Sequence, residues 1–291
     1  MASLVEWICG ERPEQLRHMW FGMASTTFDA ILSERSFIVR CNSNLGAFDA
    51  TRANLEVLGG LGLPVPRILA AGAITDAGPP FAYMVLEKIP GRDLRFELAS
   101  MTPAQQSEMA ECVVAAQNLA ERVPSMGGYG FTAIGLRGPL DSWRAVLDRD
   151  LARFLTADGW LVDRGRALSR RLDTEEAYLA AVSSLCFLDD LTTKNVIVDR
   201  GELQGFVDFD CVCFGDRLYQ IGLTLTAITA DLGIRDPFYV DELCRFTGLG
   251  SSGRELVGLY AALFAVDFLA RGAGGSRGRD DLADLIARAV R

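Results

Sequence analysis

The first third of the chain contains short runs rich in β-branched and aromatic residues that alternate with polar ones, a pattern typical of half-buried strands. Four such runs predict strands at residues 21–32, 36–41, 67–71 and 81–87. Helical spacing occurs instead at residues 4–20, where Pro13 interrupts it, and at residues 50–60. This part of the chain therefore predicts a small unit that is mainly β-sheet.

The rest of the chain has mainly helical periodicity. Its first helix has a clear start, because Thr102 can cap it, Pro103 suits its first turn and Gln105 completes a capping box. Further helices are predicted at residues 142–154, 175–184, 221–232, 237–246, 254–270 and 280–290. The predicted fold class is α+β, with a small β-rich N-terminal lobe at residues 1–88 and a larger, mainly helical C-terminal lobe at residues 89–291.

Composition and charge narrow the possible partners. Of the 291 residues, 49% are apolar and 23% are charged, as in a globular protein, and the net charge is −9. The chain has no run of Lys or Arg, which argues against nucleic acid or an anionic membrane as a partner, whereas a cationic small molecule would be attracted. The longest apolar stretch, residues 256–270, is too short to span a membrane and contains Asp267. Nothing in the sequence predicts the oligomeric state.

Cysteine and histidine usage points to a reducing compartment and excludes some chemistry. The seven cysteines are an odd number scattered in apolar settings, which favours free thiols in the cytoplasm. His18 is the only histidine, so metal sites built from several histidines are excluded. No signal peptide pattern is present at the start of the chain, and we expect a cytoplasmic protein.

The stretch from residue 186 to 210 carries the strongest chemical signal. Two apolar runs flank a polar, Gly-containing turn, which predicts a β-hairpin. With Gly201 and Glu202 as the central turn residues, Asn195 would face Asp208 at the open end, with Cβ atoms about 4.5–5.5 Å apart. Asp190, on the loop that enters the first strand, can approach the same point. Amide and carboxylate oxygens gathered in this way suit Mg²⁺.

Three linked motifs extend this pattern. They are Asp190 with Asn195 five positions later, then Asp208-Phe-Asp210, then Gly215-Asp216 followed by Tyr219. Their order and spacing resemble the aminoglycoside phosphotransferase and choline kinase-like family of small-molecule kinases, which has a bilobal protein-kinase-like fold. The resemblance implies that Asp190 is the catalytic residue, that Asn195 and Asp208 bind Mg²⁺, and that ATP or GTP is the phosphoryl donor.

The same resemblance assigns donor-binding residues in the N-terminal lobe. Arg40, in the strand Phe-Ile-Val-Arg, occupies the position of the cation that pairs with the nucleotide phosphates, and Ser25 and Thr26, with Gly22, remain to cover phosphate. The main chain of Glu87 and Ile89 would meet the edge of the base. A strand cation at the rim of the lobe is the alternative interpretation of Arg40.

The chain departs from the family at three positions. Leu188 replaces the usual His before the catalytic Asp, Asp189 replaces the usual Gly, and Asn54 stands where the partner acid of Arg40 is expected. Glu56 lies two residues further on, about 200° around the helix, and would point away from Arg40. Asp189 is interpreted as a solvated or capping acid, as is Asp199.

Two functional hypotheses follow. The first is a kinase that transfers the γ-phosphoryl group to a hydroxyl of a small molecule, with Asp190 as base. The second is a degenerate kinase fold that binds a nucleotide or a partner without turnover, as the three departures suggest. The acceptor is not predicted; Asp231, Asp236 and Asp267 in the C-terminal helices are either contacts for a polyamine or ordinary surface charges, and the latter is favoured.

Overall fold

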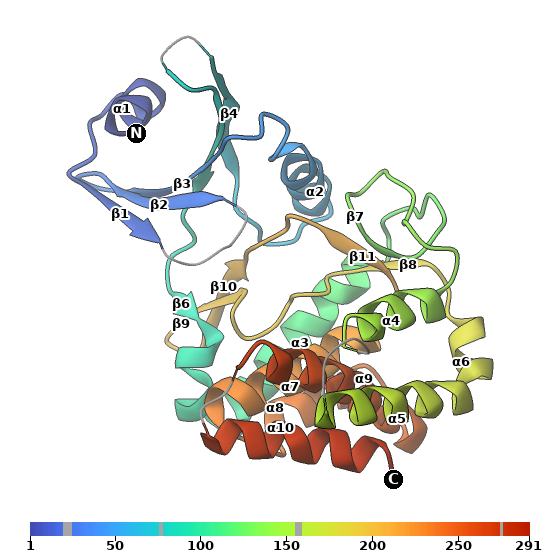
Figure 1. Cartoon of the computed structure of the whole chain (residues 1–291). Coiled ribbons are helices and arrows are strands. Elements are labelled where there is room, and N and C mark those ends of the chain that lie inside the picture. The colour runs from blue at the N-terminus through green and yellow to red at the C-terminus, as the bar shows by residue number, and fades with distance from the viewer. Residues whose placement is uncertain (20–24, 76–77, 155–158, 274–275) are drawn as a thin grey trace.

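The N-terminal third forms one antiparallel sheet of five strands in the order β1-β2-β3-β5-β4. The computed structural model describes residues 1–19, 25–75, 78–154, 159–273 and 276–291. Figure 1 shows this sheet beside the helical remainder of the molecule. The strands are β1 (Gln15–Met19), β2 (Thr26–Ile31), β3 (Ser36–Asn42), β4 (Ile68–Ile74) and β5 (Phe81–Glu87).

The two faces of this sheet belong to different cores. Because side chains alternate along a strand, Tyr83 and Val85 of β5 pack with helix α1 (Ala2–Cys9) in a small separate cluster. Met84 and Leu86 on the opposite face join the main core of the molecule, as does helix α2 (Asp49–Gly60). Helix α2 is therefore packed between the sheet and the helical part, as Figure 1 shows.

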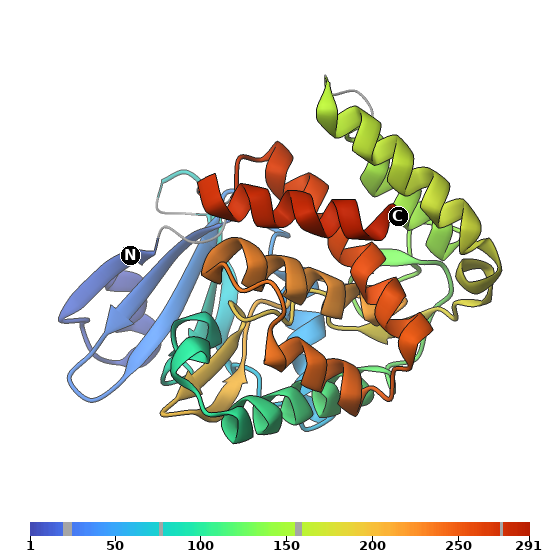
Figure 2. The same cartoon turned by 90° about the horizontal axis from the view of Figure 1, so that it is seen from below.

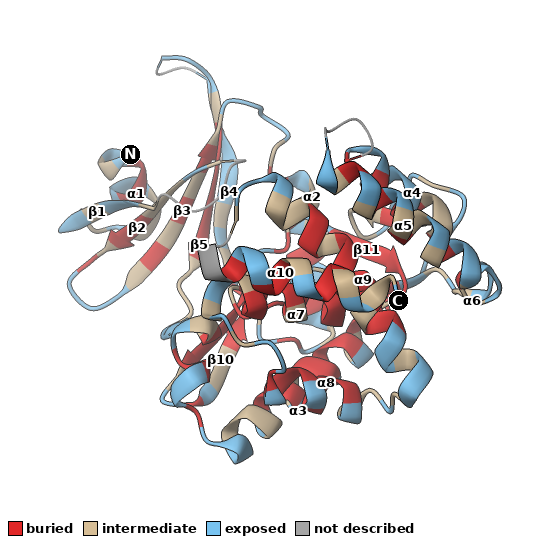
Figure 3. Ribbon diagram, turned by 60° about the horizontal axis from the view of Figure 1, so that its bottom comes forward, coloured by how far each residue is buried: buried red, intermediate tan, exposed pale blue. Residues whose placement is uncertain are grey.

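The helical part is built around α7 and α9, which are buried along much of their length (Figures 2 and 3). Its helices are α3 (Pro103–Ala120), α4 (Trp143–Ala152), α5 (Trp160–Thr174), α6 (Glu176–Ala181), α7 (Leu218–Leu232), α8 (Phe238–Phe246), α9 (Ser251–Ala270) and α10 (Ser276–Ala289). Two short 3₁₀ helices lie at Leu94–Phe96 and Leu98–Ser100.

Two three-stranded sheets, in the orders β10-β9-β6 and β7-β11-β8, lie between the large sheet and these helices (Figure 1). Their strands are β6 (Arg92–Asp93), β7 (Gly130–Thr132), β8 (Leu185–Phe187), β9 (Val196–Asp199), β10 (Glu202–Phe206) and β11 (Val212–Gly215). The first two sequence motifs lie on the segments that follow β8 and β10, and the third lies at the end of β11, so the motifs lie where the two parts of the molecule meet.

The architecture confirms the α+β prediction, and most elements lie where the pattern predicts them. Strand β5 has the predicted bounds, and α3 begins with the predicted capping box, since the Thr102 hydroxyl accepts from the Gln105 N–H and the Gln105 side chain accepts from the Thr102 N–H. Of the strand expected at residues 21–32, Thr26–Ile31 is confirmed, whereas residues 20–24 lie outside the described residues.

The structure differs from the predicted helices at three places. The opening helix ends at Cys9, and beyond Gly10 and Pro13 the chain forms β1. Pairing of β1 with β2 at the edge of the sheet outweighs the local helical spacing. Helix α5 was not predicted. The helix expected at residues 175–184 ends at Ala181, because the chain then extends into β8.

The lobe boundary at residues 88/89 stays a prediction; it falls between the end of β5 and the start of β6. All seven cysteines are free thiols. Among the described residues, no helix is both long enough and apolar enough to cross a membrane.

Candidate active site

The hairpin of β9 and β10 forms as predicted, but with a different register. Its central turn residues are Arg200 and Gly201, with φ values of 51° and 83°, so Asp199 pairs with Glu202. The prediction that Gly201 and Glu202 form the turn was wrong. Two positive φ values give the turn a twist that matches that of the paired strands, although this conformation is strained for a non-glycine residue such as Arg200. A bulge between Leu203 and Gly205 then shifts the register again.

Asn195 consequently pairs with the residue before Asp208 and not with Asp208 itself. The main-chain oxygen of Asn195 accepts a hydrogen bond from the Val207 N–H at 3.0 Å. Its side-chain nitrogen Nδ2 donates to the main-chain oxygen of Asp190 at 2.8 Å. This orientation leaves the amide oxygen Oδ1 available as a ligand. The buried Asn195 thus joins the loop that carries Asp190 to the strand that leads to Asp208.

Asp208 has a strained backbone, with φ at 68°, a value that costs a non-glycine residue roughly 1–2 kcal/mol. Burial and the negative charge of Asp210 raise the pKa of its carboxyl group, while Arg40 opposes this shift. Such strain persists only where the surrounding structure fixes it. Here the main chain of both neighbours is held: the Val207 N–H donates to the main-chain oxygen of Asn195, and the side-chain amide of Asn54 donates to the Phe209 oxygen.

Two buried glutamines hold the loop that carries Asp190. Gln117 of α3 donates to the Leu188 oxygen at 2.8 Å and accepts from the Leu188 N–H at 2.9 Å. Gln220 of α7 donates to the Leu191 oxygen at 2.7 Å. Main-chain groups on both sides of Asp190 are therefore fixed by side-chain amides, and Leu188 itself is buried in the core. The sequence motifs gave no signal for either glutamine.

The electrostatics around Asp190 favour a proton acceptor. Asp190 as a residue is exposed, but the protein packed around its carboxyl group removes enough water to raise its pKa to about 6, with the charge of Asp208 as the second cause. Asp189 is partly buried, and burial with the charge of Asp190 raises its pKa to about 8. Its interpretation as a solvated or capping acid stays a prediction. Asp199 forms an exposed pair with Arg200, in keeping with its interpretation.

Arg40 is anchored by Asp210. The Arg40 guanidinium donates from Nη1 and Nη2 to the two carboxylate oxygens of Asp210, both at 2.6 Å. Neither Asn54 nor Glu56 takes this role: Asn54 is fully buried and donates to the Phe209 oxygen at 2.9 Å, while Glu56 is exposed. Burial opposes the charge of Arg40, but its hydrogen bonds with Asp210 and the charge of that residue outweigh this effect and raise the pKa of the guanidinium.

The remaining predicted donor-site residues lie on the same sheet and at its exit. Ser25 precedes β2 and accepts from the Asn42 amide at 3.4 Å, and Thr26 is exposed at the start of β2; Gly22 lies outside the described residues. The Glu87 side chain pairs with Arg67, and the main-chain N–H of Glu87 donates to the main-chain oxygen of Arg67. Within the described part of the chain, the Ile89 N–H has no hydrogen-bond partner, so it is available to a ligand.

Gly215 and Asp216, in the third motif, pack against and hydrogen-bond to several aromatic residues. A Cβ added at Gly215 would lie 2.2 Å from the indole of Trp143, so only glycine fits there. The buried Asp216 carboxylate accepts hydrogen bonds from the hydroxyls of Tyr178 and Tyr260 at 2.8 and 2.6 Å and from the Leu218 N–H at 3.0 Å. These contacts fix the start of α7 and do not involve Asp190 or Asp208.

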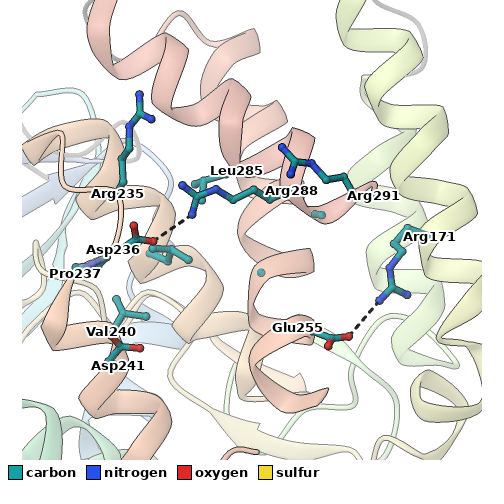
Figure 4. A pocket seen from close by; sticks show the side chains of 13 residues that line it. Arg171, Arg235, Asp236, Pro237, Val240, Asp241, Glu255, Leu285, Arg288 and Arg291 are labelled. Atoms are coloured by element: carbon teal, nitrogen blue, oxygen red, sulfur yellow. Dashed lines mark hydrogen bonds and ion pairs between the residues drawn. The ribbon is translucent and has the colours of Figure 1, made fainter. Parts of the chain in front are cut away.

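One pocket, of about 420 Å³, lies among α5, α7, α8, α9 and α10; Asp236 lines it, whereas Arg40, Asp190, Asn195 and Asp208 do not. Figure 4 shows its arginines beside acids, such as Arg288 with Asp236 and Arg171 with Glu255. A second pocket, between α4, α7 and α9, has about 170 Å³, less than the roughly 300 Å³ of a typical ligand site. Neither pocket defines an acceptor.

The three C-terminal acids considered as acceptor contacts all have cationic partners. Asp231 pairs with Lys194 at 3.0 Å, Asp236 with Arg288 at 3.1 Å and Asp267 with Arg271 at 2.8 Å. The pair of Asp231 is the one that reaches the loop between Asp190 and Asn195.

The donor set fits Mg²⁺. Asn195 offers an amide oxygen and Asp208 a carboxylate, both hard oxygen ligands. Among the described residues, no group of three or more His, Cys, Asp or Glu side chains could hold a metal ion by itself. A cation bound by two protein ligands would complete its coordination with water and substrate phosphates, as is usual for Mg²⁺.

A model of the family described as "Phosphotransferase enzyme family" matches residues 21–256 of this chain. The chain belongs to this phosphotransferase family. The match includes β2, β3 and α2 and all three motifs, so Arg40, Asp190 and Asp208 lie within it.

Relatives within the phosphotransferase family are distant. The hygromycin-B 4-O-kinase of Escherichia coli is 23% identical over 208 residues, a match that covers 69% of this chain and 58% of that protein. The chain thus matches less than two thirds of the length of this relative.

Solved structures of phosphotransferases share the fold. The apo form of a thermostable mutant of the aminoglycoside phosphotransferase APH(4)-Ia has a TM-score of 0.72 at 16% identity, covering 99% of this chain and 97% of that one. A GDP complex of the wild-type aminoglycoside 2'-phosphotransferase-IIIa has a TM-score of 0.69 at 12% identity, covering 99% and 96%. The protein-kinase-like prediction for the fold is confirmed.

Proposed function

We propose that this chain is an ATP- or GTP-dependent phosphotransferase that adds the γ-phosphoryl group to a hydroxyl of a small molecule. One observation carries the proposal: a continuous set of hydrogen bonds joins Asp190, Asn195 and the residue before Asp208 at the open end of one hairpin. This arrangement combines a proton acceptor with two hard oxygen ligands, which is what phosphoryl transfer requires.

In the proposed reaction, Asp190 orients the acceptor hydroxyl and accepts its proton as the phosphoryl group is transferred. The raised pKa of Asp190, about 6, keeps it basic enough for this task and still ionised at neutral pH. Asn195 and Asp208 would hold Mg²⁺, which neutralises charge on the donor phosphates. Arg40 would contact those phosphates from β3, and the main chain of Glu87 and Ile89 the base. Ser25 and Thr26 would cover the phosphates.

Relatives indicate which donors and acceptors to test. One solved APH(4)-Ia structure is a ternary complex with AMP-PNP and hygromycin B, and an APH(2")-IIIa structure is a complex with GDP and kanamycin, so relatives combine a nucleotide with an aminoglycoside. For this chain, a cationic acceptor is supported by the net charge of −9 and opposed by the pairing of Asp231, Asp236 and Asp267 with cations. The free cysteines support a cytoplasmic location.

The test is a phosphoryl-transfer assay with ATP and with GTP against four acceptor classes: aminoglycosides, amino sugars, choline-like alcohols and homoserine-like alcohols. Release of nucleoside diphosphate and phosphorus NMR of the product measure the transfer. We expect Mg²⁺-dependent formation of a phosphate monoester with at least one class, absent in Asp190→Asn. Tight nucleotide binding without transfer to any acceptor would favour the alternative of a kinase fold without turnover.

A further inference from the structure

The contact between Arg40 and Asp210 joins the two parts of the molecule. Arg40 belongs to β3, whereas Asp210 follows Asp208 on the segment between β10 and β11. The Arg40 side chain is 14% exposed, and its fork meets both carboxylate oxygens at 2.6 Å. Bidentate, charge-assisted pairs of this kind fix orientation as well as position.

Helix α2 does not provide the acid that pairs with Arg40, but its side chains hold the Asp210 segment. The buried Thr51 donates its hydroxyl to Oδ1 of Asp210 at 2.7 Å. Asn54, one turn further, donates to the Phe209 oxygen and accepts from the Ile134 N–H at 2.8 Å. The segment of Asp208 to Asp210 is therefore held by β3 and α2 at once.

We propose that Asp210 is the positioning residue for the phosphate-binding Arg40, replacing a helix carboxylate, so that the phosphate contact and the Mg²⁺ ligand Asp208 are assembled on one segment. The proposal rests on the proposed function. Because the acid is two residues from Asp208, any shift of this segment moves the guanidinium and the metal ligand together. Asp210 itself does not contact the reacting atoms.

The chemistry of arginine explains how one side chain serves two anions. A guanidinium has five N–H donors in a rigid fork, and the pair with Asp210 uses one from each terminal nitrogen. The Nε–H and the remaining terminal N–H groups stay available to a phosphate. A lysine ammonium has three donors and no fixed plane, so it would lose the bidentate contact.

The test is calorimetric titration of adenosine, AMP and ADP, and of the guanosine series if GTP is the donor, with Mg²⁺ and again in EDTA. The proteins are wild type, Asp210→Asn, Asp210→Glu, Thr51→Val and Arg40→Lys, each checked for folding by its thermal unfolding midpoint. We expect Asp210→Asn to weaken ADP binding by about 10- to 100-fold in both conditions, and adenosine binding not to change. Asp210→Glu should recover part of the affinity, and Thr51→Val should lose less than Asp210→Asn.

Each outcome has one meaning. If wild type binds ADP and Asp210→Asn binds it equally well, the positioning role is overturned while the proposed function stands. A loss that disappears in EDTA would make Asp210 a metal ligand instead, and an equal loss for adenosine would make it a general structural residue; both overturn the proposal. If wild type binds no nucleotide, the proposed function itself fails.

Discussion

Two acids from neighbouring motifs, Asp208 and Asp216, both have a pKa raised by burial but differ in their backbone and hydrogen bonds. At Asp208, the backbone is strained, burial and the charge of Asp210 raise the pKa of the carboxyl group, and the proposed role of this carboxylate is to hold a cation. At Asp216, the carboxylate is buried and accepts three hydrogen bonds from Tyr178, Tyr260 and Leu218. Under the proposed function, one motif acid serves the chemistry and the other serves the fold, and the hydrogen bonds of each acid distinguish the two roles.

The largest effect is expected at the proposed base. Asp190→Asn keeps the size of the side chain and removes its ability to take a proton, so kcat should fall by about 10²- to 10⁴-fold. The thermal midpoint and the affinity for Mg-nucleotide should stay close to wild type. Steady-state kinetics with the acceptor found in the transfer assay measures this. Retention of wild-type kcat would remove Asp190 from the catalytic role.

The opposite result is expected at Asp216. Asp216→Asn weakens three hydrogen bonds in a buried site, so the free energy of unfolding should fall by about 2–4 kcal/mol. The fraction that remains folded should keep its nucleotide affinity. Asp199→Asn, in an exposed pair, is the matched control and should change stability by less than about 0.5 kcal/mol. If Asp216→Asn were as stable as this control, the hydrogen bonds of Asp216 would not contribute to the stability of the fold.

Two of the glutamines of α3, Gln106 and Gln117, separate support of the site from support of the fold. Gln117→Met leaves the N–H and oxygen of Leu188 without partners, so we expect a loss of about 2 kcal/mol in stability and a fall of about tenfold in kcat. Gln106→Met is the control, since Gln106 donates to the Leu98 and Met101 oxygens, which do not belong to the motif loop. It should reduce stability without reducing kcat. Equal kinetic effects in the two variants would argue against a supporting role for Gln117 in the site.

The smallest effect concerns pH. The hydrogen bonds and charge of Arg40, opposed by burial, lower the pKa of Asp210 in the folded protein, so its contribution to stability is present above the unfolded-state value of about 3.9 and is lost as pH falls through the folded value. The stability difference between wild type and Asp210→Asn should therefore be constant above about pH 5 and shrink below about pH 4. Urea unfolding at pH 3.5, 5 and 7 measures it. A difference that does not vary with pH would show that the charge of Asp210 does not matter.

Much of the fold could be predicted from local pattern, because strand alternation at 81–87 and the cap at Thr102 are decided within a few residues. The hairpin was also predicted, but its register was not, since a bulge and the positive φ of Arg200 have no strong sequence signal. The pairing of Arg40 with Asp210 joins residues 170 positions apart. Only the folded arrangement shows that Asp210, and not residue 54, provides the carboxylate that pairs with Arg40. It also shows that Gln117 holds the main chain of Leu188, at the position where the family has a His.

The most direct measurement of the central claim is calorimetric titration of ATP and of GTP, with and without Mg²⁺, into wild type, Asp208→Ala and Asp216→Asn. We predict that wild type binds one of the nucleotides more tightly with Mg²⁺, that Asp208→Ala loses this dependence while staying folded, and that folded Asp216→Asn keeps it. Binding by Asp208→Ala that still depends on Mg²⁺ as in wild type would contradict the assignment of Asp208 and the division of roles between the two acids.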